Sequence, residues 1–115
     1  MKTAILTLAF AATATFAHAD VVLTVAAEPN MTYTIVDIDT SSAGSREVIF
    51  KTEGDGATVW ARALVSCVPL QSGNLDTGAE QADVAGEGGE TLLEDIERGT
   101  GRHAVATYTC EHDNA

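Results

Sequence analysis

Two carboxylates, Asp37 and Asp39, form the most suggestive pair of chemical groups in the sequence. They lie two residues apart in a segment where threonine alternates with aliphatic residues, a pattern typical of a β-strand. On a strand both carboxylates would point to one face, about 7 Å apart. Paired carboxylates can exchange protons with a substrate or bind a cation, so one hypothesis is a minimal carboxylate-dependent hydrolase. A solvated strand face is the alternative, because the chain carries 17 acidic residues.

The other candidate ligand groups do not form a recognisable metal motif. His112 lies between Glu111 and Asp113, but consecutive side chains diverge and a polar chain end frays, while His103 stands apart. The acidic residues after position 70 lack the alternating order of a calcium loop. They are Asp76, Glu80, Asp83 and Glu87. We expect neither a metal ion nor a cofactor.

Residues 99–104, Gly-Thr-Gly-Arg-His-Ala, match the G-x-G-x-x-A pattern of dinucleotide-binding proteins. The pattern binds a pyrophosphate only where it follows a strand and opens a helix, because the helix amides then face the ligand. The sequence predicts a helix before this segment and a strand after it. We therefore expect no dinucleotide site.

Cys67 and Cys110 are the two cysteines of the chain. An even pair in a small exported domain predicts one disulfide, and no C-x-x-C motif indicates a metal or redox site. Each cysteine shares its strand parity with apolar neighbours, Val65 for one and Tyr108 for the other. We therefore expect a bridge between the ends of two strands, pointing toward the core.

The first 19 residues have the order of a secretory signal peptide. Lys2 provides the positive start, residues 4–16 are uncharged and mainly apolar, and Ala17-His18-Ala19 matches the small-x-small site of a signal peptidase. We expect cleavage between Ala19 and Asp20, which leaves a single exported domain over residues 20–115, in the periplasm or outside the cell.

The charge balance restricts the classes of partner. The 115-residue chain has a formal net charge of −11, which repels nucleic acids and anionic membrane surfaces. The negative charge attracts a basic protein or a cationic ligand.

Trp60 and Tyr108 are expected to pack in the core. The alternative is an exposed aromatic side chain on a β surface that anchors a partner.

The elements that must position these groups are mainly strands. The sequence predicts strands over residues 20–27, 31–40, 46–52, 57–68 and 102–110. The apolar parity of the second switches near Ile35 and Val36, which indicates a bulge. Residues 57–68 also fit helical spacing, but the preceding Asp55-Gly56 is typical of a hairpin turn and favours a strand.

Two segments complete the prediction. Residues 71–90 are rich in glycine and acidic residues, which predicts a long, mobile acidic loop. Thr91 and Glu94 fit a capping box, and the Leu92, Leu93 and Ile96 stripe predicts a short helix ending at Gly99.

The predicted fold is mainly β: a small sandwich, barrel or single sheet of about five strands with one short helix. The predicted function is that of a small exported, non-enzymatic protein with a binding or structural role. One concrete form is an acidic inhibitor of a basic extracytoplasmic hydrolase, and the carboxylate-dependent hydrolase is the alternative.

Overall fold

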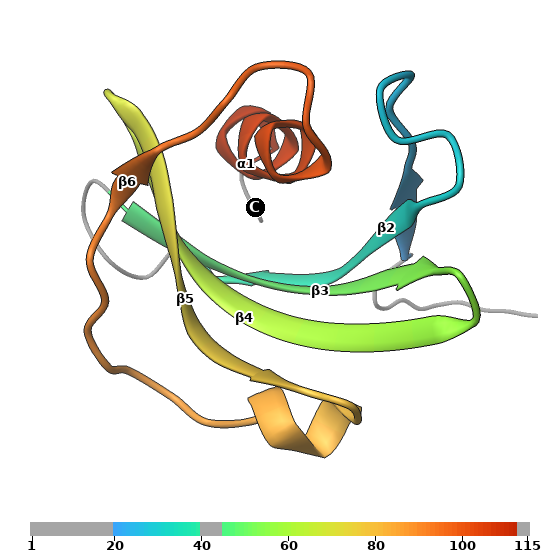
Figure 1. The fold of residues 1–115 in the computed structure, drawn as a ribbon. Coiled ribbons are helices and arrows are strands. Elements are labelled where there is room, and N and C mark those ends of the chain that lie inside the picture. Colours follow the sequence, from blue (N-terminus) through green and yellow to red (C-terminus); the bar gives the residue numbers. More distant parts are fainter. Residues whose placement is uncertain (1–19, 40–44, 113–115) are drawn as a thin grey trace, which may run out of the picture.

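The computed structural model describes residues 20–39 and 45–112. The predicted signal peptide over residues 1–19 lies outside this part, so the cleavage between Ala19 and Asp20 stays a prediction. Among the described residues, six strands form one antiparallel sheet in sequential order (Figure 1). The strands are β1 (Val21–Leu23), β2 (Thr32–Asp39), β3 (Ser45–Gly54), β4 (Ala57–Cys67), β5 (Leu70–Gly78) and β6 (Glu94–Asp95). The prediction of a mainly β fold is confirmed, in its single-sheet form.

The sheet curves around a helix, α1 (Gly101–Glu111), which lies on its concave side (Figure 1). A short 3₁₀ helix, η2 (Gln81–Val84), lies on the opposite side. The core fills the space between α1 and the sheet, because apolar side chains alternate on the strands and repeat at helical spacing on α1. Its buried residues are Tyr33, Ile35, Val48, Phe50, Ala61, Ala63, Val65, Val105 and Ala106. The outer face of the sheet carries η2 and its own polar contacts, which are described below.

Three local predictions on the strands are confirmed. Asp55 and Gly56 join β3 to β4 with φ angles of 52° and 76°, as a type I′ turn requires. Residues 57–67 form strand β4, so the helical alternative is wrong. The register of β2 against β3 shifts between Ile35 and Asp37, where the parity of the sequence switches.

The prediction of a strand over residues 102–110 is wrong, because this segment is α1. Val105 and Thr109 are buried at helical spacing, and the Thr100 hydroxyl caps the helix by accepting a hydrogen bond from the His103 amide (3.2 Å). The predicted helix over residues 91–98 is also wrong, since Glu94–Asp95 is strand β6. The apolar residues over 102–110 alternate as they do in a strand. The segment forms a helix because its apolar residues also repeat at helical spacing, which buries them against the curved sheet.

The predicted loop over residues 71–90 is wrong over most of its length. Residues 70–78 form strand β5, which pairs with β4 and, through Gln71 and Ser72, with β6. Val84 in η2 is completely buried. Within 71–90, only residues 79–80 and 85–90 lie outside helices and strands. A side chain at Gly73 would collide with the Leu92 carbonyl, so this glycine reflects close packing and not flexibility.

The predicted disulfide is confirmed. Cys67 at the end of β4 and Cys110 in α1 are bridged, with their Cα atoms 5.7 Å apart. The bridge thus joins the sheet to the helix, and not two strands as the sequence suggested. Arg46 lies beside it, with Nη1 3.0 Å from Cys67 Sγ and 3.4 Å from the Cys110 carbonyl oxygen. A cation at this end of α1 is favourable for the helix dipole.

Candidate functional site

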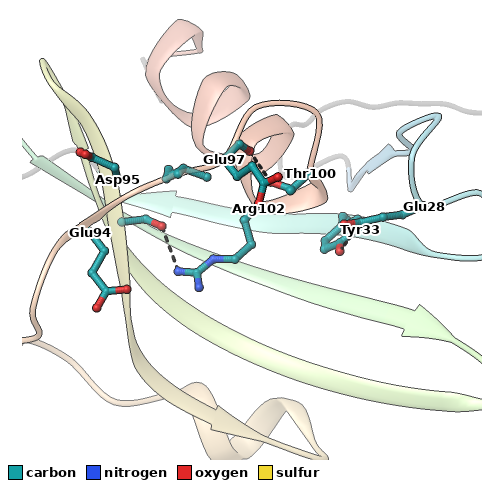
Figure 2. A pocket seen from close by; sticks show the side chains of 9 residues that line it. Glu28, Tyr33, Glu94, Asp95, Glu97, Thr100 and Arg102 are labelled. Atoms are coloured by element: carbon teal, nitrogen blue, oxygen red, sulfur yellow. Dashed lines mark hydrogen bonds between the residues drawn. The ribbon is translucent and has the colours of Figure 1, made fainter.

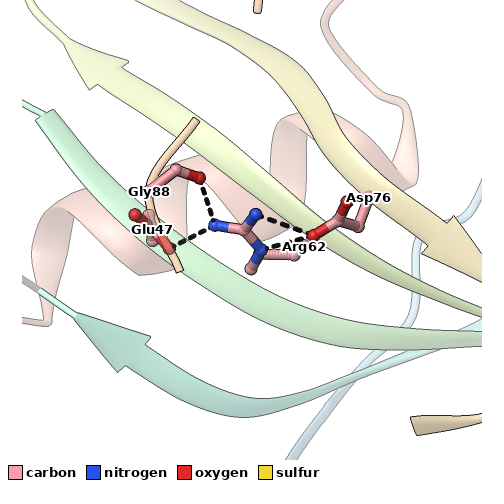
Figure 3. A network of polar contacts seen from close by, with 4 residues as sticks. All are labelled: Glu47, Arg62, Asp76 and Gly88. Carbon is pink, nitrogen blue, oxygen red and sulfur yellow. Dashed lines mark hydrogen bonds and ion pairs between the residues drawn. The ribbon is translucent and has the colours of Figure 1, made fainter. Parts of the chain in front are cut away.

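The outer face of the sheet is organised around a buried arginine, Arg62, in the middle of β4 (Figure 3). Its guanidinium donates to Asp76 Oδ2 from Nε (2.8 Å) and pairs with it through Nη2 (2.7 Å). Its Nη1 donates to Glu47 Oε1 (2.9 Å) and to the Gly88 carbonyl oxygen (2.8 Å). The Arg62 side chain is only 5% exposed. It therefore ties β3, β5 and the segment after η2 to the centre of the outer face.

These contacts determine the charge of the group. Burial by itself lowers the pKa of Arg62, but the hydrogen bonds to Asp76 and Glu47 outweigh it and raise the pKa above its usual value. Arg62 is therefore a permanent cation. It was not singled out in the sequence, although a lone charge between Ala57 and Val68, in an otherwise uncharged strand, is a recognisable signal of a paired buried residue.

A hollow of about 340 Å³ opens beside Arg62 on the outer face. Asp37 and Asp39 both line it, so the prediction that they share one face is confirmed. Both are exposed. The complete lining is Asp37, Asp39, Glu47, Ile49, Arg62, Ala85, Gly86 and Glu87. The hollow thus joins β2 and β3 to the segment after η2.

A second hollow of about 390 Å³ adjoins the first, because both are lined by Asp37 and Ile49. Its lining is Asp20, Val36, Asp37, Ile49, Trp60 and Gln81. We call the two hollows together the outer groove. Trp60 is half-buried there, and the Lys51 ammonium lies 5.5 Å from the centre of its ring. Trp60 is thus on the outer face and not in the core, which corrects the expectation from the sequence.

The outer groove carries a large excess of negative charge. Five carboxylates line its described part, against the single guanidinium of Arg62. They are Asp20, Asp37, Asp39, Glu47 and Glu87. Among the described residues, no three histidine, cysteine or acidic side chains converge as metal ligands do. The arrangement therefore spreads negative charge along a surface and does not concentrate it at one point.

A separate cleft of about 340 Å³ lies on the concave side, at the start of α1 (Figure 2). Its lining is Glu28, Tyr33, Ser72, Glu94, Asp95, Ile96, Glu97, Thr100 and Arg102. We call it the end cleft. Arg102 extends into it and donates from Nη2 to Ser72 Oγ (3.0 Å), which links α1 to β5 (Figure 2).

Glu28 occupies the amino end of α1 within this cleft. Its Oε1 accepts hydrogen bonds from the Gly101 amide (3.2 Å) and from the Tyr33 hydroxyl (2.6 Å). A side chain at Gly101 would collide with the Tyr33 ring. The glycine-rich segment 99–104 does open a helix, so the reason for rejecting it from the sequence is wrong. A pyrophosphate would nevertheless have to displace Glu28, because that carboxylate already takes the helix amide.

The Glu28–Tyr33 contact gives a prediction at high pH. Burial, followed by the hydrogen bond to Glu28 and its negative charge, raises the pKa of Tyr33 to about 12. The unfolded value is about 10, so the folded state binds the proton more tightly. The corresponding stability is complete below pH 10 and is lost as the pH rises to about 12. We expect the free energies of unfolding of the wild type and Tyr33→Phe to converge over this interval in urea titrations. A constant difference would contradict the assignment.

The two histidines among the described residues, His103 and His112, line neither site. The His112 ring stacks on Tyr108, with the ring centres 3.8 Å apart, and its Nδ1 lies 3.1 Å from the Tyr108 carbonyl oxygen. Tyr108 is half-buried and packs against the core. His103 lies in the first turn of α1, and Asp113 is outside the described residues. The structure therefore does not bring these groups together with Asp37 and Asp39.

Comparisons with known proteins identify no relative: the chain matches no protein-family model, no curated protein and no solved structure. Among the described residues, no helix has the length and apolar character needed to cross a membrane.

Proposed function

We propose that this protein is an exported, non-enzymatic binding protein that holds a basic protein or another cationic ligand in the outer groove. The observation that carries the proposal is the charge of that groove, whose described lining contains five carboxylates and one guanidinium. The guanidinium pairs with Asp76 and Glu47, so it offsets little of the negative potential that the groove presents to a cation.

Two further features support this proposal. The net charge of −11 steers a basic partner toward the protein at long range. In the groove, Trp60 lies beside Ile49, and the Lys51 ammonium 5.5 Å from the centre of its ring shows that this aromatic surface is compatible with a cation. Steering thus affects the rate of association, while the groove provides the contacts.

The hydrolase alternative has less support. A general acid at neutral pH needs a carboxyl group in an apolar, desolvated setting. Asp37 and Asp39 are both exposed on β2, so neither has such a setting.

Salt dependence tests the proposal. With a small basic protein such as cytochrome c as the probe, we expect binding at about 10 mM salt that is abolished at about 1 M, where the Debye length falls from roughly 30 to 3 Å. Asp37→Asn combined with Asp39→Asn should lower the affinity by about 0.5–2 kcal/mol, because each ion pair of this kind contributes about 0.2–1 kcal/mol.

The matched control is Glu94→Gln combined with Glu97→Gln. These exposed residues line the end cleft, and their replacement changes the net charge by the same amount. Calorimetry should show little effect of this pair. Equal losses for both pairs would place binding outside the groove, and no binding at low salt would leave only a passive envelope protein.

A further inference from the structure

The disulfide between Cys67 and Cys110 lies beside a cation on the concave side of the sheet. Arg46 shares that side with Val48 and Phe50, because residues two apart on a strand point to one face. Its Nη1 donates to Cys67 Sγ (3.0 Å) and to the Cys110 carbonyl oxygen (3.4 Å). The guanidinium therefore contacts the sulfur of Cys67 and the backbone of Cys110.

The position of Cys110 adds a second difference between the two sulfurs. Cys110 is in the last turn of α1, where the negative end of the helix dipole disfavours an anion. Glu111 follows it directly and carries a formal negative charge. Cys67 instead ends strand β4, and strands have only small net dipoles. A thiolate is therefore more stable at Cys67, beside Arg46, than at Cys110.

Thiol–disulfide exchange distinguishes the two sulfurs by this stability. An attacking thiolate forms a bond to one sulfur of a disulfide, and the other sulfur leaves as a thiolate. Exchange is faster where the leaving thiolate is the more stable one. An external thiolate is therefore expected to attack Cys110 Sγ and to expel Cys67 Sγ beside Arg46.

The surroundings of the bond allow a small thiol to approach. Both cysteines are half-buried. Val68, which follows Cys67, is 92% exposed, and Glu111, which follows Cys110, is also exposed. The bond therefore lies where the interface between α1 and the sheet meets the solvent.

We infer that Cys110 is a site of reversible modification by small thiols, directed by Arg46. The thiolate of a low-molecular-weight thiol such as glutathione forms a bond to Cys110 Sγ. The bond between Cys110 and Cys67 breaks, and its electron pair leaves on Cys67 Sγ. The glutathione sulfur is oxidised and the Cys67 sulfur is reduced, so the step needs no further oxidant. It opens the covalent link between the sheet and α1, on the side opposite the outer groove.

Locating the adduct tests the inference. The folded wild type is incubated with excess reduced glutathione and quenched in acid, where exchange stops because thiols are protonated. Digestion with pepsin, which is active in acid, gives peptides whose masses show which cysteine carries glutathione. We expect about fivefold more adduct on Cys110 than on Cys67, which corresponds to about 1 kcal/mol between the two leaving groups. Equal adducts, an excess on Cys67, or no adduct on the folded protein would overturn the inference.

Variants of Arg46 test its part in directing the exchange. Arg46→Gln and Arg46→Met both remove the cation, and the second keeps the apolar stem. In either variant the excess on Cys110 should fall to about twofold, the part contributed by the helix end. Arg46→Lys keeps the charge and should retain most of the excess.

Arg98→Gln is the matched control, because it removes one positive charge from the exposed turn before α1. The fivefold excess on Cys110 should persist in this variant. An undiminished excess in the neutral Arg46 variants would overturn the directing role of Arg46. Salt-dependent binding in the outer groove is measured separately, so its failure would overturn the proposed function and not this inference.

Discussion

Replacing Cys67 by serine is expected to lower the free energy of unfolding by about 2–5 kcal/mol, the usual loss when a small secreted domain loses a disulfide. The bridge to Cys110 spans a sequence separation of 43 residues. In the chain-entropy model, a closed loop of this size restricts the unfolded state by about 4 kcal/mol. The disulfide is also the covalent link between the sheet and α1. This helix has 11 residues, which are too few to be stable unless the helix packs against the sheet.

The core explains why the link matters. α1 contributes mainly Val105, Ala106 and Thr109 to the buried interface, and β4 faces it with Ala61 and Ala63. Small side chains bury little apolar area, so the docking of α1 gains less from burial than a leucine-rich helix would. We therefore expect Cys67→Ser to lose helical circular dichroism earlier in a urea titration than the wild type.

The control is the wild type with its disulfide reduced, which should unfold at nearly the same urea concentration as Cys67→Ser. Cys110→Ser should behave likewise, because each single variant removes the same bond. Two reactive thiols per chain in the denatured, unreduced wild type would contradict the bridge, and a loss below about 1 kcal/mol would contradict its role in stability.

Replacing Arg62 by alanine is expected to cost about 3–5 kcal/mol, the range for breaking a buried ion pair by removing one partner. The change leaves Asp76 and Glu47 without their shared cation, and the Gly88 carbonyl without its donor. Two neighbouring carboxylates then repel each other across the void. The segment over residues 85–90 should detach, so limited proteolysis of the variant should cut there first.

Arg98→Ala provides the matched control. Arg98 is exposed in the turn before α1, so its loss should change the stability by no more than about 0.5 kcal/mol. Arg62→Lys keeps the charge but cannot reproduce the forked hydrogen bonds to Asp76 and Glu47, so its stability should lie between those of the wild type and Arg62→Ala. If Arg62→Ala unfolds within about 1 kcal/mol of the wild type, the network does not stabilise the outer face.

Several features of the protein were determined by the sequence alone, because short-range rules decide them. The turn at Asp55 and Gly56 needs only residues that accept positive φ, and the bulge near Ile35 follows from one slip in an alternating pattern. The pairing of the two cysteines follows from their number. The shared face of Asp37 and Asp39 follows from the period of a strand.

Tertiary structure alone decided the identity of the C-terminal elements. Residues 101–111 alternate well enough for a strand, and their helical spacing becomes decisive only when a curved sheet offers a concave face to cover. The same holds for residues 70–78, whose glycines and acids resemble a loop. There Asp76 pairs with Arg62, and Gly73 makes room for the segment that leads into β6.

The outer groove is the clearest case of this kind. Asp37, Ile49, Trp60 and Glu87 are far apart in the sequence, and each looks ordinary in its own segment. The order of the strands and the contact between Arg62 and Gly88 bring them to one surface. Local patterns report which side of its own strand a residue occupies, whereas a binding surface depends on which strands and segments become neighbours, and only long-range packing determines that.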